Sequence, residues 1–124
     1  MKKSLIKEKS YSFAIEIVVL YKTLLKQNEY VLSKQVLKAG TSIGANVEEA
    51  LAGQSRADFL SKMSIASKEA RETNYWLRLI RDSDMIDRDK LESLLLESET
   101  IINILSAIVK TTSANNSNLK TKNS

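Results

Sequence analysis

The sequence predicts an all-α protein, an antiparallel up-down four-helix bundle, on three observations. Four segments repeat apolar residues at intervals of three and four, the period of a helix with one buried face. The chain has no proline, which would interrupt helical hydrogen bonding, and only three glycines. Connections between the segments are short, so consecutive helices are expected to run antiparallel. Its 124 residues suit one domain, which we expect to comprise a bundle at residues 1–110 and a disordered polar tail at residues 111–124.

The first periodic segment covers residues 10–27, and Ser10 is its expected N-cap. Its expected inward positions are Ala14, Ile17, Val18, Tyr21, Leu24 and Leu25. Between Phe13 and Tyr21 only Glu16 is polar, so this helix is apolar nearly all round. A single four-helix bundle of this size cannot bury both faces. We therefore expect the second face to contact another copy of the chain.

The second segment, residues 31–51, carries two glycines in its middle, Gly40 and Gly44. Its expected inward stripe is Leu32, Val36, Ala39, Ile43, Val47 and Ala50. Each mid-helix glycine costs about 1 kcal/mol relative to alanine. A kink or the close approach of a neighbouring helix would explain them, and we favour close approach. Asn46 and Glu49 are expected to be structural polar residues, with the Asn46 amide tying neighbouring groups together.

The third and fourth segments begin with clear helix-start patterns. Ser55 and Asp58 have the spacing of a capping box with Asp in place of Glu. Asp87 opens the fourth segment, and Ile86 and Leu91 are spaced as a hydrophobic staple across it. The expected inward stripes are Phe59, Met63, Ala66, Ala70, Thr73, Leu77 and Ile80, then Leu91, Leu94, Leu95, Ile101, Ile102, Leu105, Ile108 and Val109.

The composition excludes most catalytic chemistry. Without histidine or cysteine, the chain cannot form a Ser-His triad, a Glu-x-x-His metal site or a thiolate site. A carboxylate-only metal site remains conceivable at Glu48, Glu49, Glu69 and Glu72, although such residues are more ordinarily solvated or paired with Lys and Arg. The Gly40-x-x-x-Gly44 pattern lies inside a helical segment and no Walker lysine follows it. We expect no catalytic residue, metal or cofactor.

Neither a secretory signal nor a membrane span is predicted, so we expect a cytoplasmic protein. The apolar run after Lys2 and Lys3 is interrupted by charged residues, and no stretch of roughly 18 apolar residues exists. The net charge is +4, and it is unevenly distributed, with an excess of lysine in residues 1–38 and an excess of acid in residues 83–110. This asymmetry favours anionic partners.

The strongest binding candidate is a stripe of three basic residues and one tyrosine on the third segment. Lys68, Arg71, Tyr75 and Arg78 recur at three- and four-residue spacing, opposite the apolar stripe. Such a stripe can hold phosphates and stack a base. The alternative is a solvated face in which Glu72 and Asp82 neutralise Lys68 and Arg78 through helix-surface ion pairs. Lys34 and Lys38 on the second segment are additional nucleic-acid-binding candidates.

Three runs of sequence resemble the ribosomal-RNA intervening-sequence protein family, also called the four-helix bundle protein family. They are QVLKAGTSIGANVEEA at residues 35–50, SRADF at residues 55–59 and IASKEARETNYWLR at residues 65–78. The resemblance covers about residues 9–110. It implies an up-down four-helix bundle that assembles into a ring-like homopentamer. The family includes proteins encoded within large-subunit ribosomal RNA inserts and the accessory variability determinant of diversity-generating retroelements, a pentamer that binds a reverse transcriptase and nucleic acid.

Two positions depart from the family pattern. Leu37 precedes Lys38 where many members carry a basic pair, and Gly53 and Gln54 stand where many have Gly-Arg-Arg. Both departures remove charge from regions that the resemblance expects to meet nucleic acid. The resulting hypothesis is a non-enzymatic, homo-oligomeric scaffold that binds RNA, DNA or a nucleic-acid enzyme such as a reverse transcriptase. The alternative is a protein-interaction module that binds no nucleic acid.

Overall fold

The computed structural model describes the backbone of residues 2–123 and the side chains of residues 5–115. Four helices account for all regular structure in this part of the chain, so the all-α prediction is confirmed. They are α1 (Lys2–Lys26), α2 (Leu32–Ala52), α3 (Arg56–Asp82) and α4 (Arg88–Asn123). None of the helices among the described residues is both long enough and apolar enough to cross a bilayer.

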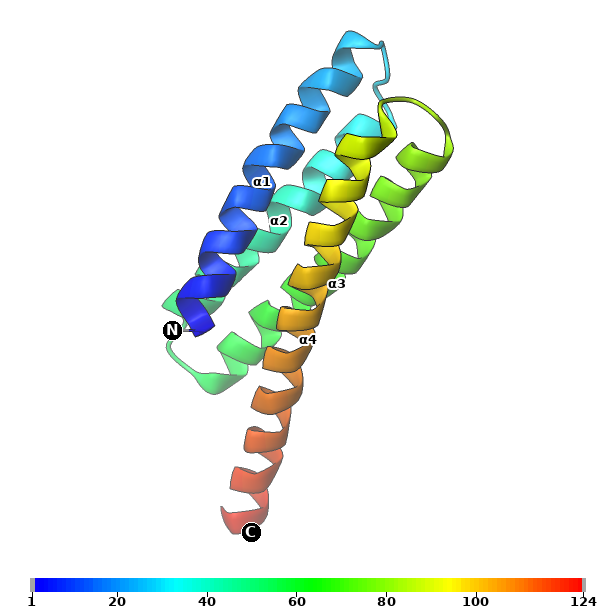
Figure 1. The fold of residues 1–124 in the computed structure, drawn as a ribbon. Coiled ribbons are helices and arrows are strands. Elements are labelled where there is room, and N and C mark those ends of the chain that lie inside the picture. Colours follow the sequence, from blue (N-terminus) through cyan, green and yellow to red (C-terminus); the bar gives the residue numbers. More distant parts are fainter. Residues whose placement is uncertain (1, 124) are drawn as a thin grey trace.

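Each helix packs against the next one along the chain, and α1 also contacts α4. Figure 1 shows the α1–α2 and α3–α4 connections at one end of the molecule and the α2–α3 connection at the other. The α1–α4 contact is the smallest of the four, so this side of the bundle is the least tightly packed.

α4 projects beyond the other three helices (Figure 1). Residues 111–123 continue this helix, whereas the sequence predicted a disordered tail from residue 111. Neither proline nor glycine occurs after Gly53, so neither of the two strongest helix breakers interrupts the backbone hydrogen bonding of α4. The domain boundary after residue 110 stays a prediction.

The buried core of α2, α3 and α4 follows the predicted stripes, with Leu32, Phe59, Ile102, Ile108 and Val109 only partly buried. In α1 the predicted start is wrong, and of the predicted inward positions Ile17 and Leu24 are fully buried whereas Ala14, Val18, Tyr21 and Leu25 are only partly buried. The helix begins at Lys2, and Ser10 is a fully buried residue inside it instead of an N-cap. The inward positions of α1 are Ile6, Ser10, Phe13, Ile17, Leu20 and Leu24. Because α1 is apolar nearly all round, its own periodicity could not identify the buried face.

The two mid-helix glycines of α2 lie against α1, as predicted. A Cβ atom at Gly40 would lie 2.9 Å from both Cγ atoms of Ile17, and one at Gly44 would lie 3.4 Å from the backbone oxygen of Ser10. Because α2 carries no side chain at these two positions, the buried face of α1 lies directly against the α2 backbone there. This close approach keeps the distance between the two helices short.

Local hydrogen bonds cap the end of α1 and the starts of α3 and α4. Asn28 adopts a left-handed conformation (φ 61°), and its N–H and that of Glu29 donate to the carbonyls of Leu25 and Leu24. This pair of bonds is a Schellman motif. At the start of α3, the Ser55 hydroxyl accepts from the Asp58 N–H at 3.1 Å, which confirms the predicted cap. Asp87 accepts from the Asp89 N–H at the start of α4.

Candidate nucleic-acid interface

The basic stripe predicted on α3 lies on the solvent-exposed side of that helix. Lys68, Arg71, Tyr75 and Arg78 are all exposed. The side chains that face the interior from the same helix are Met63, Ala66, Ala70, Thr73, Leu77 and Ile80. The four predicted residues thus form one outward surface, which we call the α3 stripe.

Neutral groups hold the two arginines of the α3 stripe. Arg71 Nη2 donates to the hydroxyl of Ser106 on α4 at 2.9 Å. Arg78 Nε donates to Asn74 Oδ1 at 2.9 Å, and its guanidinium carbon lies 5.7 Å from the centre of the Tyr75 ring. This distance allows a cation–π interaction. Both guanidinium groups are therefore fixed in position while their positive charges stay unneutralised by direct contact with an acid.

The ion pairs expected to neutralise this stripe do not form in the structure. Asp82 pairs instead with Arg81, at 2.8 Å from Nε, and Glu72 accepts from the indole N–H of Trp76. The hydrogen bond from Arg81 lowers the pKa of Asp82, and the more distant charges of Arg88 and Arg78 add to this effect. Lys68 makes no ion pair or hydrogen bond among the described residues.

The other predicted polar residues lie on α2. Lys34 and Lys38 are exposed there, and no ion pair or hydrogen bond within the described part of the chain joins them to the α3 stripe. Asn46 is half-buried and donates to the Ser42 carbonyl of its own helix at 2.8 Å. Glu49 forms an ion pair with Lys62 of α3 at 3.2 Å, which links the two helices.

The acids considered for a metal site are spread over two helices. Glu48 and Glu49 lie exposed on α2, and Glu69 and Glu72 are partly buried on α3. Within the described residues, no group of three or more acidic side chains gathers where a metal ion could be held. Their geometry gives no support to a carboxylate metal centre.

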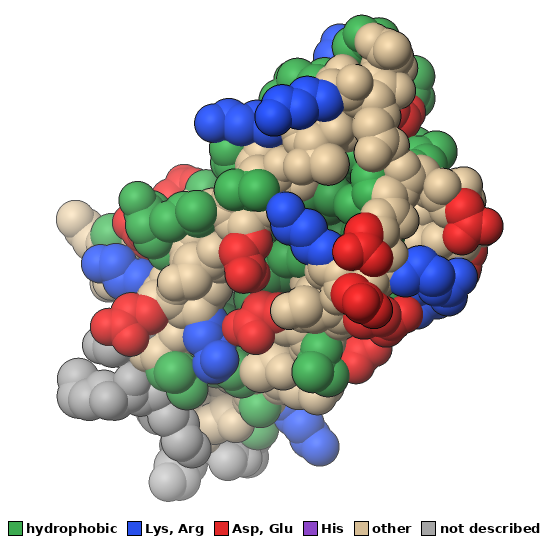
Figure 2. Space-filling model, turned by 45° about the horizontal axis from the view of Figure 1, so that its top comes forward, with side chains coloured by type: hydrophobic (Ala, Val, Ile, Leu, Met, Phe, Trp, Pro, Cys, Tyr) green, Lys and Arg blue, Asp and Glu red, His purple; other side chains and the backbone are tan. Residues whose placement is uncertain are grey.

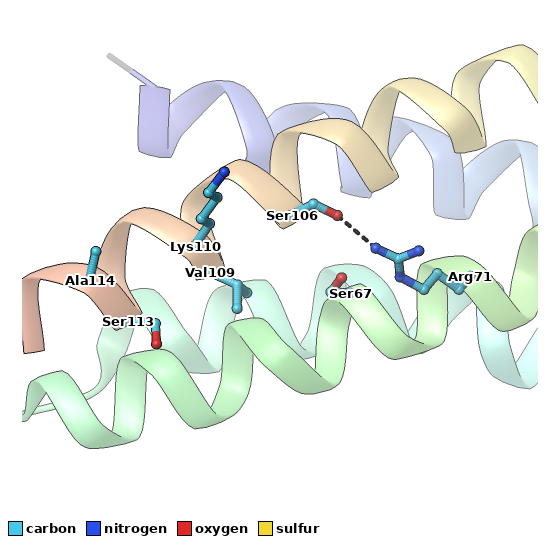
Figure 3. Close-up of a pocket in the computed structure, with 7 residues that line it drawn as sticks. All are labelled: Ser67, Arg71, Ser106, Val109, Lys110, Ser113 and Ala114. Atoms are coloured by element: carbon cyan, nitrogen blue, oxygen red, sulfur yellow. Dashed lines mark hydrogen bonds between the residues drawn. The ribbon is translucent and has the colours of Figure 1, made fainter. Parts of the chain in front are cut away.

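The structure adds a groove between α3 and α4 that sequence patterns did not identify. It has a volume of about 510 Å³ and is lined by Ser67, Arg71, Ser106, Val109, Lys110, Ser113 and Ala114. Figure 3 shows Arg71 reaching from α3 to Ser106 on α4, with Ser67, Val109 and Ser113 between the two helices and the Lys110 side chain directed away from α3. The four-residue spacing of Ser67 and Arg71, and of Ser106 and Lys110, was the only sequence signal for it.

Outside this groove the surface charge is mixed. On the face shown in Figure 2, basic and acidic side chains alternate around exposed hydrophobic ones. Charge alone therefore does not single out a binding surface on this face. The α3 stripe differs from its surroundings in that two arginines without an acidic partner are held in position by neutral groups beside an exposed tyrosine.

The comparisons with known proteins agree with the resemblance found in the sequence. A family model described as 23S rRNA-intervening sequence protein matches residues 2–107. A crystal structure of a protein with unknown function, from the S23 ribosomal protein family of Bacteroides thetaiotaomicron, is 50% identical to the chain with a TM-score of 0.85. That similarity covers 89% of this chain and 99% of the other. None of the curated proteins is significantly similar. The chain belongs to the 23S rRNA-intervening sequence protein family.

Proposed function

We propose that this protein is a non-enzymatic, cytoplasmic scaffold in which up-down four-helix bundles assemble as a homo-oligomer, a pentamer by family resemblance, and bind nucleic acid. It requires no cofactor. The observation that carries the binding proposal is the α3 stripe, where Arg71 and Arg78 are held by neutral groups and Lys68 is unpaired. Cations free of acidic partners are available to replace the counterions of a phosphate backbone.

The aromatic residue of the stripe supports binding of unpaired bases. Tyr75 is 49% exposed, and its ring is braced by Arg78 on one side and by the edge of Trp76, with ring centres 5.1 Å apart. A braced, half-exposed ring can stack on any base, because every base has an aromatic face. The description of the matched family refers to 23S rRNA, which makes RNA the first nucleic acid to test.

The exposed face of α1 supports assembly. Tyr11, Ile15 and Val19 follow one another at four-residue intervals on its outer side and are 61%, 52% and 44% exposed. Aligned apolar side chains on one helix face form a contiguous patch that favours burial against another protein surface. An identical copy of the chain is the partner that the family resemblance implies. A reverse transcriptase or another nucleic-acid enzyme is a further proposed partner.

Charge reversal on the α3 stripe tests nucleic-acid binding. We expect Arg71→Glu combined with Arg78→Glu to weaken binding of single-stranded RNA and of DNA, measured by fluorescence anisotropy over a salt series. Each lost phosphate contact should reduce the log–log salt slope by about 0.7 for a single strand. The control is Arg56→Glu combined with Lys90→Glu, which changes the net charge equally at exposed positions outside the stripe.

The alternative function is a protein-interaction module, favoured by the same apolar face of α1. Unchanged RNA and DNA affinity in the stripe variant would show that the stripe is not the binding surface. Absence of any RNA or DNA retention at low salt by the folded, assembled wild-type protein would select the module instead.

A further inference from the structure

The groove between α3 and α4, which we call the α3–α4 groove, combines features of an oxyanion site. Its lining includes two cations, Arg71 and Lys110, and three hydroxyl groups, and it contains no acidic side chain. Guanidinium and ammonium groups are the usual protein ligands of phosphate, and hydroxyl groups add neutral donors. We propose that this groove binds a phosphoryl group.

The hydroxyl groups of the groove are available as donors. Elsewhere in these helices, Thr41, Ser42 and Thr73 donate to carbonyl groups one turn earlier in their own helix. Ser106 is different, because its oxygen accepts from Arg71 while no hydrogen bond within the described residues uses its proton. Ser67 and Ser113 likewise donate to no described group. An oxyanion in the groove would accept these free hydroxyl protons.

The Arg71–Ser106 hydrogen bond positions the guanidinium before any ligand binds. It joins residues 35 positions apart in the chain and spans the gap between the two helices. A fixed guanidinium loses less side-chain entropy on binding than a free one. Lys110 follows Ser106 by one helical turn and belongs to the groove lining, and its side chain points away from α3 (Figure 3). Rotation about its flexible side-chain bonds would bring the ammonium group over a bound phosphate.

This inference rests in part on the proposed function, because the phosphate of a nucleic-acid backbone is one source of the ligand and free phosphate is the other. The α3–α4 groove shares Arg71 with the α3 stripe. A backbone phosphate held in the groove would leave an adjoining nucleotide free to reach toward Tyr75 on the same helix. Lys110, which lines the groove and is not part of the α3 stripe, separates the two claims.

The experiment compares Lys110→Gln with Lys90→Gln, an exposed lysine on the same helix outside the groove. The probes are a short labelled oligouridylate, followed by anisotropy, and inorganic phosphate, followed by amide chemical shifts. We expect Lys110→Gln to weaken oligouridylate binding roughly fivefold and to lower the salt slope by about 0.7, with Lys90→Gln unchanged. Ser106→Ala should weaken binding as well, and circular dichroism melting verifies that each variant is folded.

The outcomes separate this site from the proposed function. If oligouridylate binds but Lys110→Gln and Lys90→Gln affect it equally, the groove site is wrong and the α3 stripe remains. If inorganic phosphate shifts the amides of Ser106 and Ser113 while no oligonucleotide binds, the groove is a site for free phosphate and nucleic-acid binding is wrong. If neither probe binds, both proposals fail.

Discussion

At the scale of single residues, the start of α2 depends on a side chain that precedes the helix. Val31 occupies the N-cap position and offers no side-chain acceptor. The carboxylate of Glu29 takes over, accepting from the N–H groups of Val31, Leu32 and Ser33 at 3.2, 3.0 and 2.7 Å. These donors would otherwise lack partners at the helix N-terminus. Glu29 is therefore the cap of α2, although it precedes the helix by three residues.

The pKa of Glu29 shows the effect of this cap. Partial burial raises the pKa, but the hydrogen bonds from the backbone of Leu32, Ser33 and Val31 outweigh burial and lower it below the ordinary value. A carboxyl group with a lowered pKa stabilises the fold above the pKa of the unfolded chain, and this contribution disappears as the pH falls through the folded pKa. The contribution is therefore complete at neutral pH and lost in acid.

We expect Glu29→Gln to destabilise the protein by about 1 kcal/mol at neutral pH, the usual cost of losing a helix cap. Urea unfolding at neutral and acidic pH should show the difference from wild type shrinking as Glu29 itself becomes protonated. Glu16→Gln, at an exposed position in the middle of α1, is the control and should change stability by less than about 0.5 kcal/mol. A difference that persists unchanged into acid would contradict the assigned role of the charge.

At the scale of elements, the contact between α1 and α2 determines which face of α1 is buried. α2 presents Gly40 and Gly44 to α1, and Ile17 and Ser10 occupy the space that glycine leaves. Ile17 is fully buried, and its β-branched side chain has few alternative rotamers. It therefore cannot move aside for a larger residue at position 40.

The two glycines should respond differently to alanine. Gly40→Ala places a methyl group 2.9 Å from Ile17, and we expect overpacking of about 1–3 kcal/mol to exceed the gain of about 1 kcal/mol in helix propensity. Gly44→Ala meets its nearest atoms at 3.4 Å and should leave stability unchanged or raise it by up to about 1 kcal/mol.

Urea unfolding of both variants provides the measurement. Combining Gly40→Ala with Ile17→Ala, which removes both clashing Cγ atoms, should destabilise less than the sum of the two single changes. Two results would show that α1 does not pack closely at Gly40. One is an equal change in the free energy of unfolding for Gly40→Ala and Gly44→Ala, and the other is an additive change when Gly40→Ala is combined with Ile17→Ala.

At the scale of the whole molecule, α1 contacts α4 less extensively than the other neighbouring helices contact one another, and both helices carry exposed apolar side chains. Tyr11, Ile15 and Val19 lie outward on α1, and Leu96 on α4 is also exposed. Along α4 no charged residue occurs from Thr100 to Val109. Lys9 of α1 and Glu97 of α4 form an ion pair at 3.5 Å across the α1–α4 side of the bundle, so the apolar side chains, and not the whole side, are suited to burial in an interface.

We expect light scattering to give a mass near five subunits, and Ile15→Glu to reduce it because an unpaired carboxylate would be buried in the interface. Ile65→Glu makes the same change at an exposed position on α3 and should leave the assembly intact. Circular dichroism checks that both variants are folded. A wild-type protein that is a stable monomer at micromolar concentration would contradict the assembly proposal.

Local sequence patterns suffice to predict four helices, the buried stripes of α2, α3 and α4, the cap at Ser55 and the exposed position of the α3 stripe. Each of these depends on neighbours within a few turns, where helical periodicity and capping chemistry act. The register of α1 and the α3–α4 groove depend instead on how the helices pack against one another. α1 is apolar on several faces, so its partners select the buried one. Arg71 and Ser106 lie 35 positions apart in the sequence, and they meet because α3 and α4 pack side by side in one axial register.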